Sequence, residues 1–151
     1  MKKSILTIIW LFIACIGFSF ANGKDKGTDI INASLKRDFN NAALIRTDNY
    51  RAFTKATVEM NGRVLYAYYS LNGDLMGVAG NILSDKLPIE LETELRSKYA
   101  SGYWITDLFE LSTDGTTEYF VTLESTDYVL ILKSVESNGW VVYSKKRKEV
   151  E

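Results

Sequence analysis

The chain has 151 residues, of which 46% are hydrophobic, and its 18 basic and 19 acidic side chains give a formal net charge of −1. A nucleic-acid-binding protein carries a clear excess of basic residues, so this balance argues against a nucleic-acid partner. The sequence contains no histidine and one cysteine. Catalytic triads that use histidine are therefore excluded, as are zinc sites built from histidine and cysteine.

The first 21 residues have the pattern of a secretory signal peptide. Lys2-Lys3 precede an apolar run over 5–20. Ser19-Phe20-Ala21 then offers small residues at the −3 and −1 positions of a cleavage site. Cleavage there predicts a periplasmic or secreted chain with no stable membrane insertion. Two alternatives remain open. One is an uncleaved anchor helix, although the run is shorter than the roughly 20 residues that span a bilayer; the other is lipidation of Cys15.

The mature chain is expected to begin with a flexible lead-in over 22–27, followed by a first helix that starts at Thr28. Ile31, Leu35 and Phe39 recur at four-residue spacing, which places them on one apolar stripe. Thr28 and the residue after it are suited to cap such a helix.

A second amphipathic helix is predicted from Pro88 onward. Leu91, Leu95 and Tyr99 form its apolar stripe, and proline suits the start of a helix because its missing N–H would have no partner there. Gly102 marks the end of this helix. Both helices must pack their stripes against another element.

Strand and turn signals follow each helix. Runs rich in Val, Leu, Ile and Tyr are separated by Asn61-Gly62, Asn72-Gly73 and Asn138-Gly139, and Asn-Gly is a strong hairpin signal. The two helix stripes also match at a constant offset. We therefore predict an α+β fold of two tandem repeats, each a helix followed by an antiparallel β-meander, with the helices packed on one face of the sheet. The repeats span 28–80 and 87–145 of a single domain over 28–145, which a charged tail over 146–151 follows.

Several of these features together resemble the PepSY-like, β-lactamase-inhibitor-like group of small exported bacterial proteins. The resemblance rests on Leu87-Pro88, the spaced leucines of the second helix, Gly102, the run 118–123 and Asn138-Gly139. It is best over 87–145 and weaker over 28–80. It implies a tandem helix-plus-sheet fold in an exported protein that binds a partner without catalysing a reaction. It transfers no functional residue, because the matching positions are core and turn residues.

Strand alternation divides the predicted sheet into two faces, because successive side chains of a strand point to opposite sides. If Tyr119 faces the helices, Phe120 faces away, and the same alternation places Ile131, Tyr66 and Tyr68 on the face away from the helices. Aromatic residues with an apolar body and a polar tip suit a protein-binding surface. We therefore predict Tyr66, Tyr68, Phe120 and Ile131 as binding residues. The alternative is that strands carry such residues without any binding role.

The leading functional hypothesis is an exported non-catalytic binding module, with an inhibitor as one form of it, that recognises an envelope protein or peptide through the open sheet face. No cofactor or metal is expected, since Asp114-Gly115 lacks the further oxygen ligands of a calcium loop. The basic run 145–148 is interpreted as a solvated tail, with an anionic partner as the alternative.

An envelope glycan hydrolase that uses carboxylates is the alternative function. Glu118 and Glu124 would be one acid pair on the same predicted strand. Six residues of strand separate them by about 20 Å, which is too far for that chemistry. Another pair brought together by folding remains open.

Overall fold

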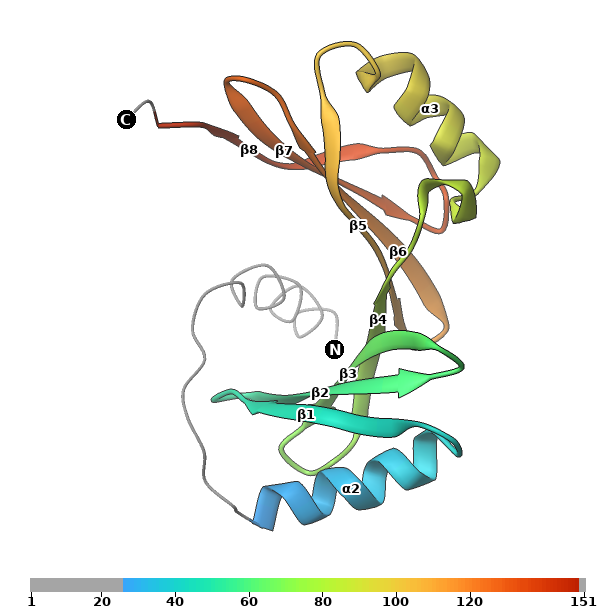
Figure 1. The fold of residues 1–151 in the computed structure, drawn as a ribbon, viewed down its shortest axis with the longest axis vertical. Helices are drawn as coiled ribbons and strands as arrows, with labels where there is room; N and C mark the ends of the chain where they lie inside the picture. Colours follow the sequence, from blue (N-terminus) through green and yellow to red (C-terminus); the bar gives the residue numbers. More distant parts are fainter. Residues whose placement is uncertain (1–25, 150–151) are drawn as a thin grey trace.

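The computed structural model describes residues 26–149 (Figure 1). The predicted signal peptide, Cys15 and most of the predicted lead-in lie outside the described residues. Within 26–149 no helix is both long and apolar enough to cross a membrane. In chain order the elements are α2 (Lys26–Asp38), β1 (Ala43–Asn49), β2 (Phe53–Met60), β3 (Arg63–Ser70), β4 (Leu75–Asn81), the 3-10 helix η1 (Ser84–Lys86), α3 (Ile89–Tyr99), β5 (Trp104–Thr113), β6 (Thr116–Glu124), β7 (Tyr128–Val135) and β8 (Val141–Arg147).

All eight of these strands belong to one antiparallel sheet, in which neighbours in sequence are also neighbours in space, from β1 at one edge to β8 at the other. The predicted architecture of two tandem helix-plus-meander repeats is therefore wrong. β4 pairs with β5 from Val78↔Ser112 to Asn81↔Phe109, so backbone hydrogen bonding continues through the middle of the sheet. Two short helices, of 13 and 11 residues, accompany it. Their matching apolar stripes have a simpler cause, since any helix that lies on a sheet needs one such stripe.

Both helices pack on the same face of the sheet, one near each end (Figure 1). The predicted stripes are confirmed, because Ile31, Leu35, Leu91 and Leu95 are each at most 6% exposed. The core under α2 includes Ala56, Val58, Leu65, Ala67 and Tyr69. The core under α3 includes Leu108, Val121, Leu123, Leu130, Leu132 and Trp140.

The sequence analysis missed strand β1 and misplaced one turn. Most side chains of β1 are exposed, so this strand lacks the alternation that identifies a half-buried strand. The turn at Asn61-Gly62 is confirmed, with φ angles of 54° and 74° at the two residues. Between β7 and β8, however, the left-handed pair is Glu136 and Ser137, so Asn138-Gly139 follows the tight turn instead of forming it.

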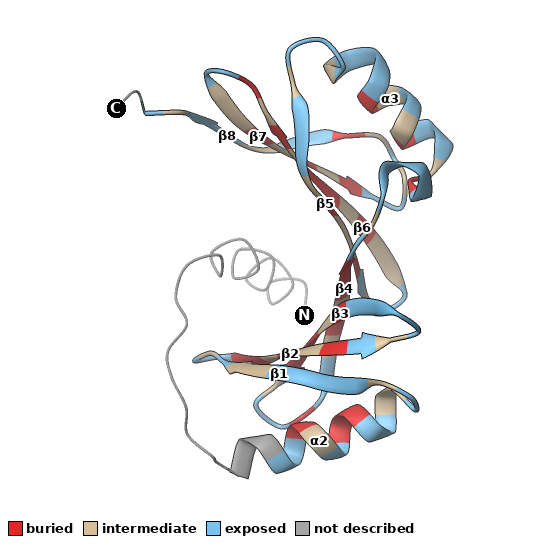
Figure 2. Ribbon diagram, in the orientation of Figure 1, coloured by how far each residue is buried: buried red, intermediate tan, exposed pale blue. Residues whose placement is uncertain are grey.

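The sheet is twisted and curved, with α2 and α3 outside the curve and the other face turned toward its inside (Figure 1). Buried positions run through the middle of the sheet, whereas β1 is largely exposed (Figure 2). The middle strands approach closely at Gly77, where an added Cβ would lie 2.6 Å from Cγ2 of Thr113. The inner face of this curved sheet carries the candidate site.

Candidate functional site

The inner face of the curved sheet, opposite to α2 and α3, is called the open face below. A band of mostly aromatic side chains crosses it from the β2 side to β8. Five of its members are buried and five are partly buried. The buried members are Phe53, Tyr68, Ala79, Leu111 and Phe120, and the partly buried members are Tyr50, Tyr66, Met76, Phe109 and Tyr143.

Ring contacts hold each end of this aromatic band together. At the β2 end, Tyr50 and Phe53 are stacked with centroids 4.6 Å apart, and Phe53 contacts Tyr68 at 5.9 Å. At the β8 end, Phe120 is stacked on Phe109 at 5.0 Å and meets Tyr143 edge-on at 5.9 Å. Stacked and edge-on ring pairs are favourable arrangements, so the rings at each end of the band support one another.

The structure corrects the exposure expected for two of the predicted binding residues. Alternation assigns their face as expected, since Tyr66, Tyr68 and Phe120 belong to the aromatic band and Tyr119 packs, partly buried, on the core under α3. Their expected exposure is wrong for two of them, because Tyr68 is 7% and Phe120 only 2% exposed. Tyr66 and Ile131 are half-buried. Alternation identifies the face on which a side chain lies but does not reveal how deeply that side chain is buried.

Exposed apolar residues also lie on the open face, outside the aromatic band. Trp104 is 50% exposed, Val141 60% and Val64 46%. Register places all three on the open face, because Trp104 pairs with Glu124, Val141 with Lys133, and Val64 with Glu59. The sequence analysis did not single out Trp104, since the bulge after Ile105 interrupts the alternation of β5.

Lysines cover several of the rings. The Nζ atom of Lys55 lies 4.4 Å from the centroid of Tyr66, and that of Lys148 lies 5.1 Å from the centroid of Trp104. Lys148 also forms an ion pair of 2.8 Å with Glu124, whose pKa it lowers chiefly by hydrogen bonding. The basic run 145–148 is therefore not a free tail, because its first three residues end strand β8 and its last pairs with β6.

Glu118 and Lys133 form a largely buried ion pair near the β8 end of the band. Lys133 Nζ lies 2.7 Å from Oε1 of Glu118, and the two side chains are only 14% and 11% exposed. Burial, and secondarily the Glu118 carboxylate, raises the pKa of Tyr143 above its usual value. Glu118 and Glu124 lie six residues apart on β6 and pair with different lysines, so they are not placed together as the acid pair of a glycan hydrolase. Within 26–149 no group of three or more carboxylate, thiol or imidazole side chains is placed to hold a metal ion.

A separate groove lies on the other face, between α3 and the strands beneath it. Its volume is about 170 Å³, and it is lined mainly by Leu95, Tyr99, Tyr103, Ile105 and Leu123. Glu92 and Arg96 at its border bind each other at 2.7 Å. The groove therefore offers apolar contacts and little polar recognition.

Solved structures resemble this chain, whereas no family model and no curated protein sequence matches it. A BLIP-like protein from Bacteroides fragilis aligns with a TM-score of 0.65 at 19% identity, over 83% of this chain and 89% of that one. The chain has a BLIP-like fold. A candidate periplasmic protein from Bacteroides eggerthii aligns with a TM-score of 0.68 at 12% identity, over 79% of this chain and 87% of its own. A DUF2874 family protein from Bacteroides ovatus aligns with a TM-score of 0.68 at 10% identity, over 82% and 89%.

At these identities the likeness concerns the fold alone. The β-lactamase-inhibitor-like half of the predicted resemblance is confirmed at that level, because a BLIP-like protein is among the neighbours. The PepSY half finds no support among the three neighbours described above. The function of this chain therefore has to be argued from the open face.

Proposed function

We propose that this protein is an exported, non-catalytic binding module that holds a protein or peptide on the open face of its BLIP-like sheet. Inhibition of an enzyme is the finer hypothesis. The observation that carries the proposal is the aromatic band together with exposed apolar side chains on the same face, including Trp104 at 50% exposure. Rigid, partly exposed aromatic residues supply most of the energy of many protein interfaces, because they bury much area at little cost in conformational entropy.

Further observations support the proposal. The signal-peptide pattern over 1–21 favours export, and one structural neighbour bears the name of a candidate periplasmic protein. The lysines above Tyr66 and Trp104 bring charge to the apolar band, which is typical of the polar border around the apolar centre of an interface. A curved face of this kind suits a convex partner surface.

A capture experiment with matched variants tests the proposal. Residues 22–151 are immobilised and exposed to an envelope extract from the source organism, and bound protein is identified by mass spectrometry. Trp104→Ser and Tyr66→Ser remove partly exposed rings from the open face and should each lower the captured amount at least about tenfold, the effect of losing one strong interface residue.

Ile89→Ser is the control for this experiment. Ile89 is 66% exposed and lies at the start of α3, away from the open face. Its change should leave capture intact, and all three variants should keep thermal midpoints close to that of the wild type. Capture that survives both open-face changes, or that the Ile89 change removes equally, would contradict the proposal.

A further inference from the structure

The Glu118–Lys133 pair is incompletely satisfied. Glu118 is 8% exposed, and its Oε1 atom forms the ion pair with Lys133 Nζ. Its Oε2 atom is buried and has no hydrogen-bond donor among the described residues. A buried carboxylate oxygen without a donor loses the hydrogen bonds that water would make to it and costs free energy. The open face therefore contains an acceptor whose partner is missing from the part of the chain that the structure describes.

The same place has the features of a cation-binding site. Phe109, Phe120 and Lys133 form one row across β5, β6 and β7, because Phe120 pairs with both of the others in register. Lys133 Nζ lies 5.4 Å from the centroid of Phe120, and Tyr143 meets the same ring edge-on. A carboxylate beside aromatic rings attracts a cation through both the negative charge and the electron-rich ring faces.

We propose that Glu118, Phe120 and Tyr143 form a receptor for an arginine side chain of the bound partner, and that Lys133 fills this receptor in the free protein. The inference rests on the proposed function of the open face and adds the chemistry of the partner. An ammonium group is a point charge that reaches one carboxylate oxygen here. A guanidinium group is a planar fork that donates to both oxygens at once and stacks on aromatic rings, so it satisfies Oε2 where Lys133 does not.

The site can be reached from the open face. Val141, which pairs with Lys133 in register, is 60% exposed, and Tyr143 is only partly buried. When Lys133 swings outward, its ammonium group regains full hydration, which offsets part of the cost of leaving Glu118. The exchange therefore needs a side-chain movement and no opening of the sheet.

Small-molecule titrations test the inference without the natural partner. N-Acetylarginine amide is titrated into the wild type and into Lys133→Met, and binding is followed by NMR shifts of the Phe120 and Tyr143 ring signals. N-Acetyllysine amide, N-acetylcitrulline amide and N-acetylglutamate amide serve as comparison probes. The arginine probe should bind Lys133→Met about tenfold more tightly than the wild type, which is the factor expected if Lys133 occupies the receptor nine-tenths of the time.

The comparison probes make the outcome specific. The lysine probe should bind more weakly than the arginine probe, and the citrulline probe, which has the shape of arginine without its charge, should not bind. Glu118→Gln combined with Lys133→Met should abolish the response. Equal shifts from arginine and citrulline, binding that survives the loss of Glu118, or a preference for the glutamate probe would overturn the inference.

Lys133→Arg keeps the inference testable if Lys133→Met does not fold. This variant supplies the guanidinium fork from the chain itself, so it should raise the thermal midpoint and suppress binding of the arginine probe. A lower midpoint together with unchanged probe binding would refute the inference. Should the envelope partner bind Glu118→Gln as well as the wild type, the arginine receptor fails while the binding function of the open face stands.

Discussion

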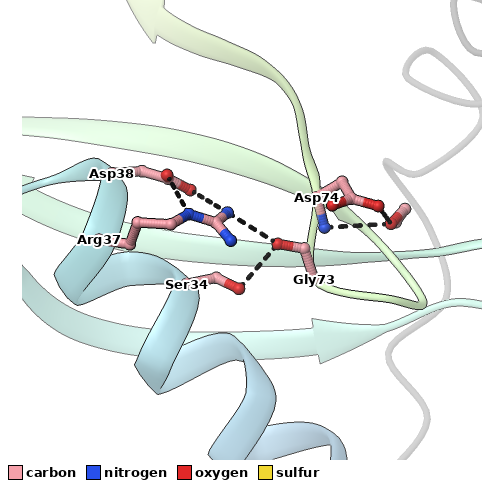
Figure 3. Close-up of polar contacts among 6 residues, drawn as sticks. Ser34, Arg37, Asp38, Gly73 and Asp74 are labelled. Atoms are coloured by element: carbon pink, nitrogen blue, oxygen red, sulfur yellow. Dashed lines mark hydrogen bonds and ion pairs between the residues drawn. The ribbon is translucent and has the colours of Figure 1, made fainter.

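The two helices of this protein are fastened to the sheet by different chemistry. At the end of α2, the Ser34 hydroxyl and the Arg37 guanidinium both donate to the Gly73 carbonyl in the β3–β4 turn, at 2.7 and 3.0 Å (Figure 3). At α3 the direction is reversed, because Trp140 donates both hydrogen bonds to acceptors on the helix. The Glu94 carboxylate accepts the backbone N–H of Trp140 at 3.1 Å, and the indole N–H of Trp140 donates to the Leu91 carbonyl at 2.9 Å.

The difference shows two ways in which a helix can be held on a curved sheet. The α2 contact depends on close approach to a glycine, and its donors keep their protonation state over the ordinary pH range. The α3 contact depends on one large side chain that belongs to the core and on one titratable carboxylate. The stability of the α2 contact and that of the α3 contact should therefore respond differently to side-chain truncation, to an added methyl group and to low pH.

The largest effect is expected from Trp140→Ala. Trp140 is 8% exposed within the core under α3, so its removal creates a cavity and also loses the bond to the Leu91 carbonyl. We expect a loss of about 3–5 kcal/mol in the free energy of unfolding, measured by denaturant titration. Trp140→Phe keeps most of the apolar volume and should cost much less. Equal losses for the two variants would mean that the hydrogen bond, and not the packing, holds α3.

Gly73→Ala should have the next largest effect, at the α2 end. Gly73 has φ of +83°, and an added Cβ would lie 2.7 Å from both Ile30 Cγ2 and Ser34 Oγ. Backbone strain and overpacking together should cost about 2–4 kcal/mol. Gly62→Ala is the matched control, because Gly62 has φ of +74° but nothing within 4 Å of the added atom. If both glycine variants lose the same amount in denaturant titrations, close approach of the turn to α2 contributes nothing.

The smallest effect is expected from Glu94→Gln, and its dependence on pH should distinguish the α3 contact from the α2 contact. Hydrogen bonds from Lys98 and from the Trp140 N–H hold the pKa of Glu94 below its ordinary value of 4.5. Because the folded pKa is the lower one, this contribution is present above about pH 4.5 and is lost as the pH falls through the folded pKa. Glu94→Gln should therefore lower the free energy of unfolding by about 1 kcal/mol at pH 7 and by almost nothing at pH 2.

Ser34→Ala is the control for this pH comparison. The hydroxyl of Ser34 does not titrate, so the cost of its removal should be the same at both pH values when thermal or denaturant unfolding is measured. A Glu94 variant whose cost is also independent of pH would show that the carboxylate charge plays no part in holding α3.

Much of the local structure could be predicted from the sequence. The stripes Ile31–Leu35 and Leu91–Leu95 identify both helices, because a helix on a sheet buries one face with a period near 3.6. Alternation in β6 assigns Tyr119 to the helix side and Phe120 to the open face, because a strand turns successive side chains to opposite sides. These properties depend on neighbours within a few residues along the chain.

The features that matter most for binding were decided only by the tertiary structure. Local patterns do not show that β4 pairs with β5, and the two-repeat interpretation failed at that pairing. They do not show that Phe120 and Tyr68 are buried on the face opposite to α2 and α3, nor that Lys133 packs against Glu118. Each of these depends on how strands far apart in sequence bend toward one another, and a period of two residues identifies a face without telling how deeply that face is buried.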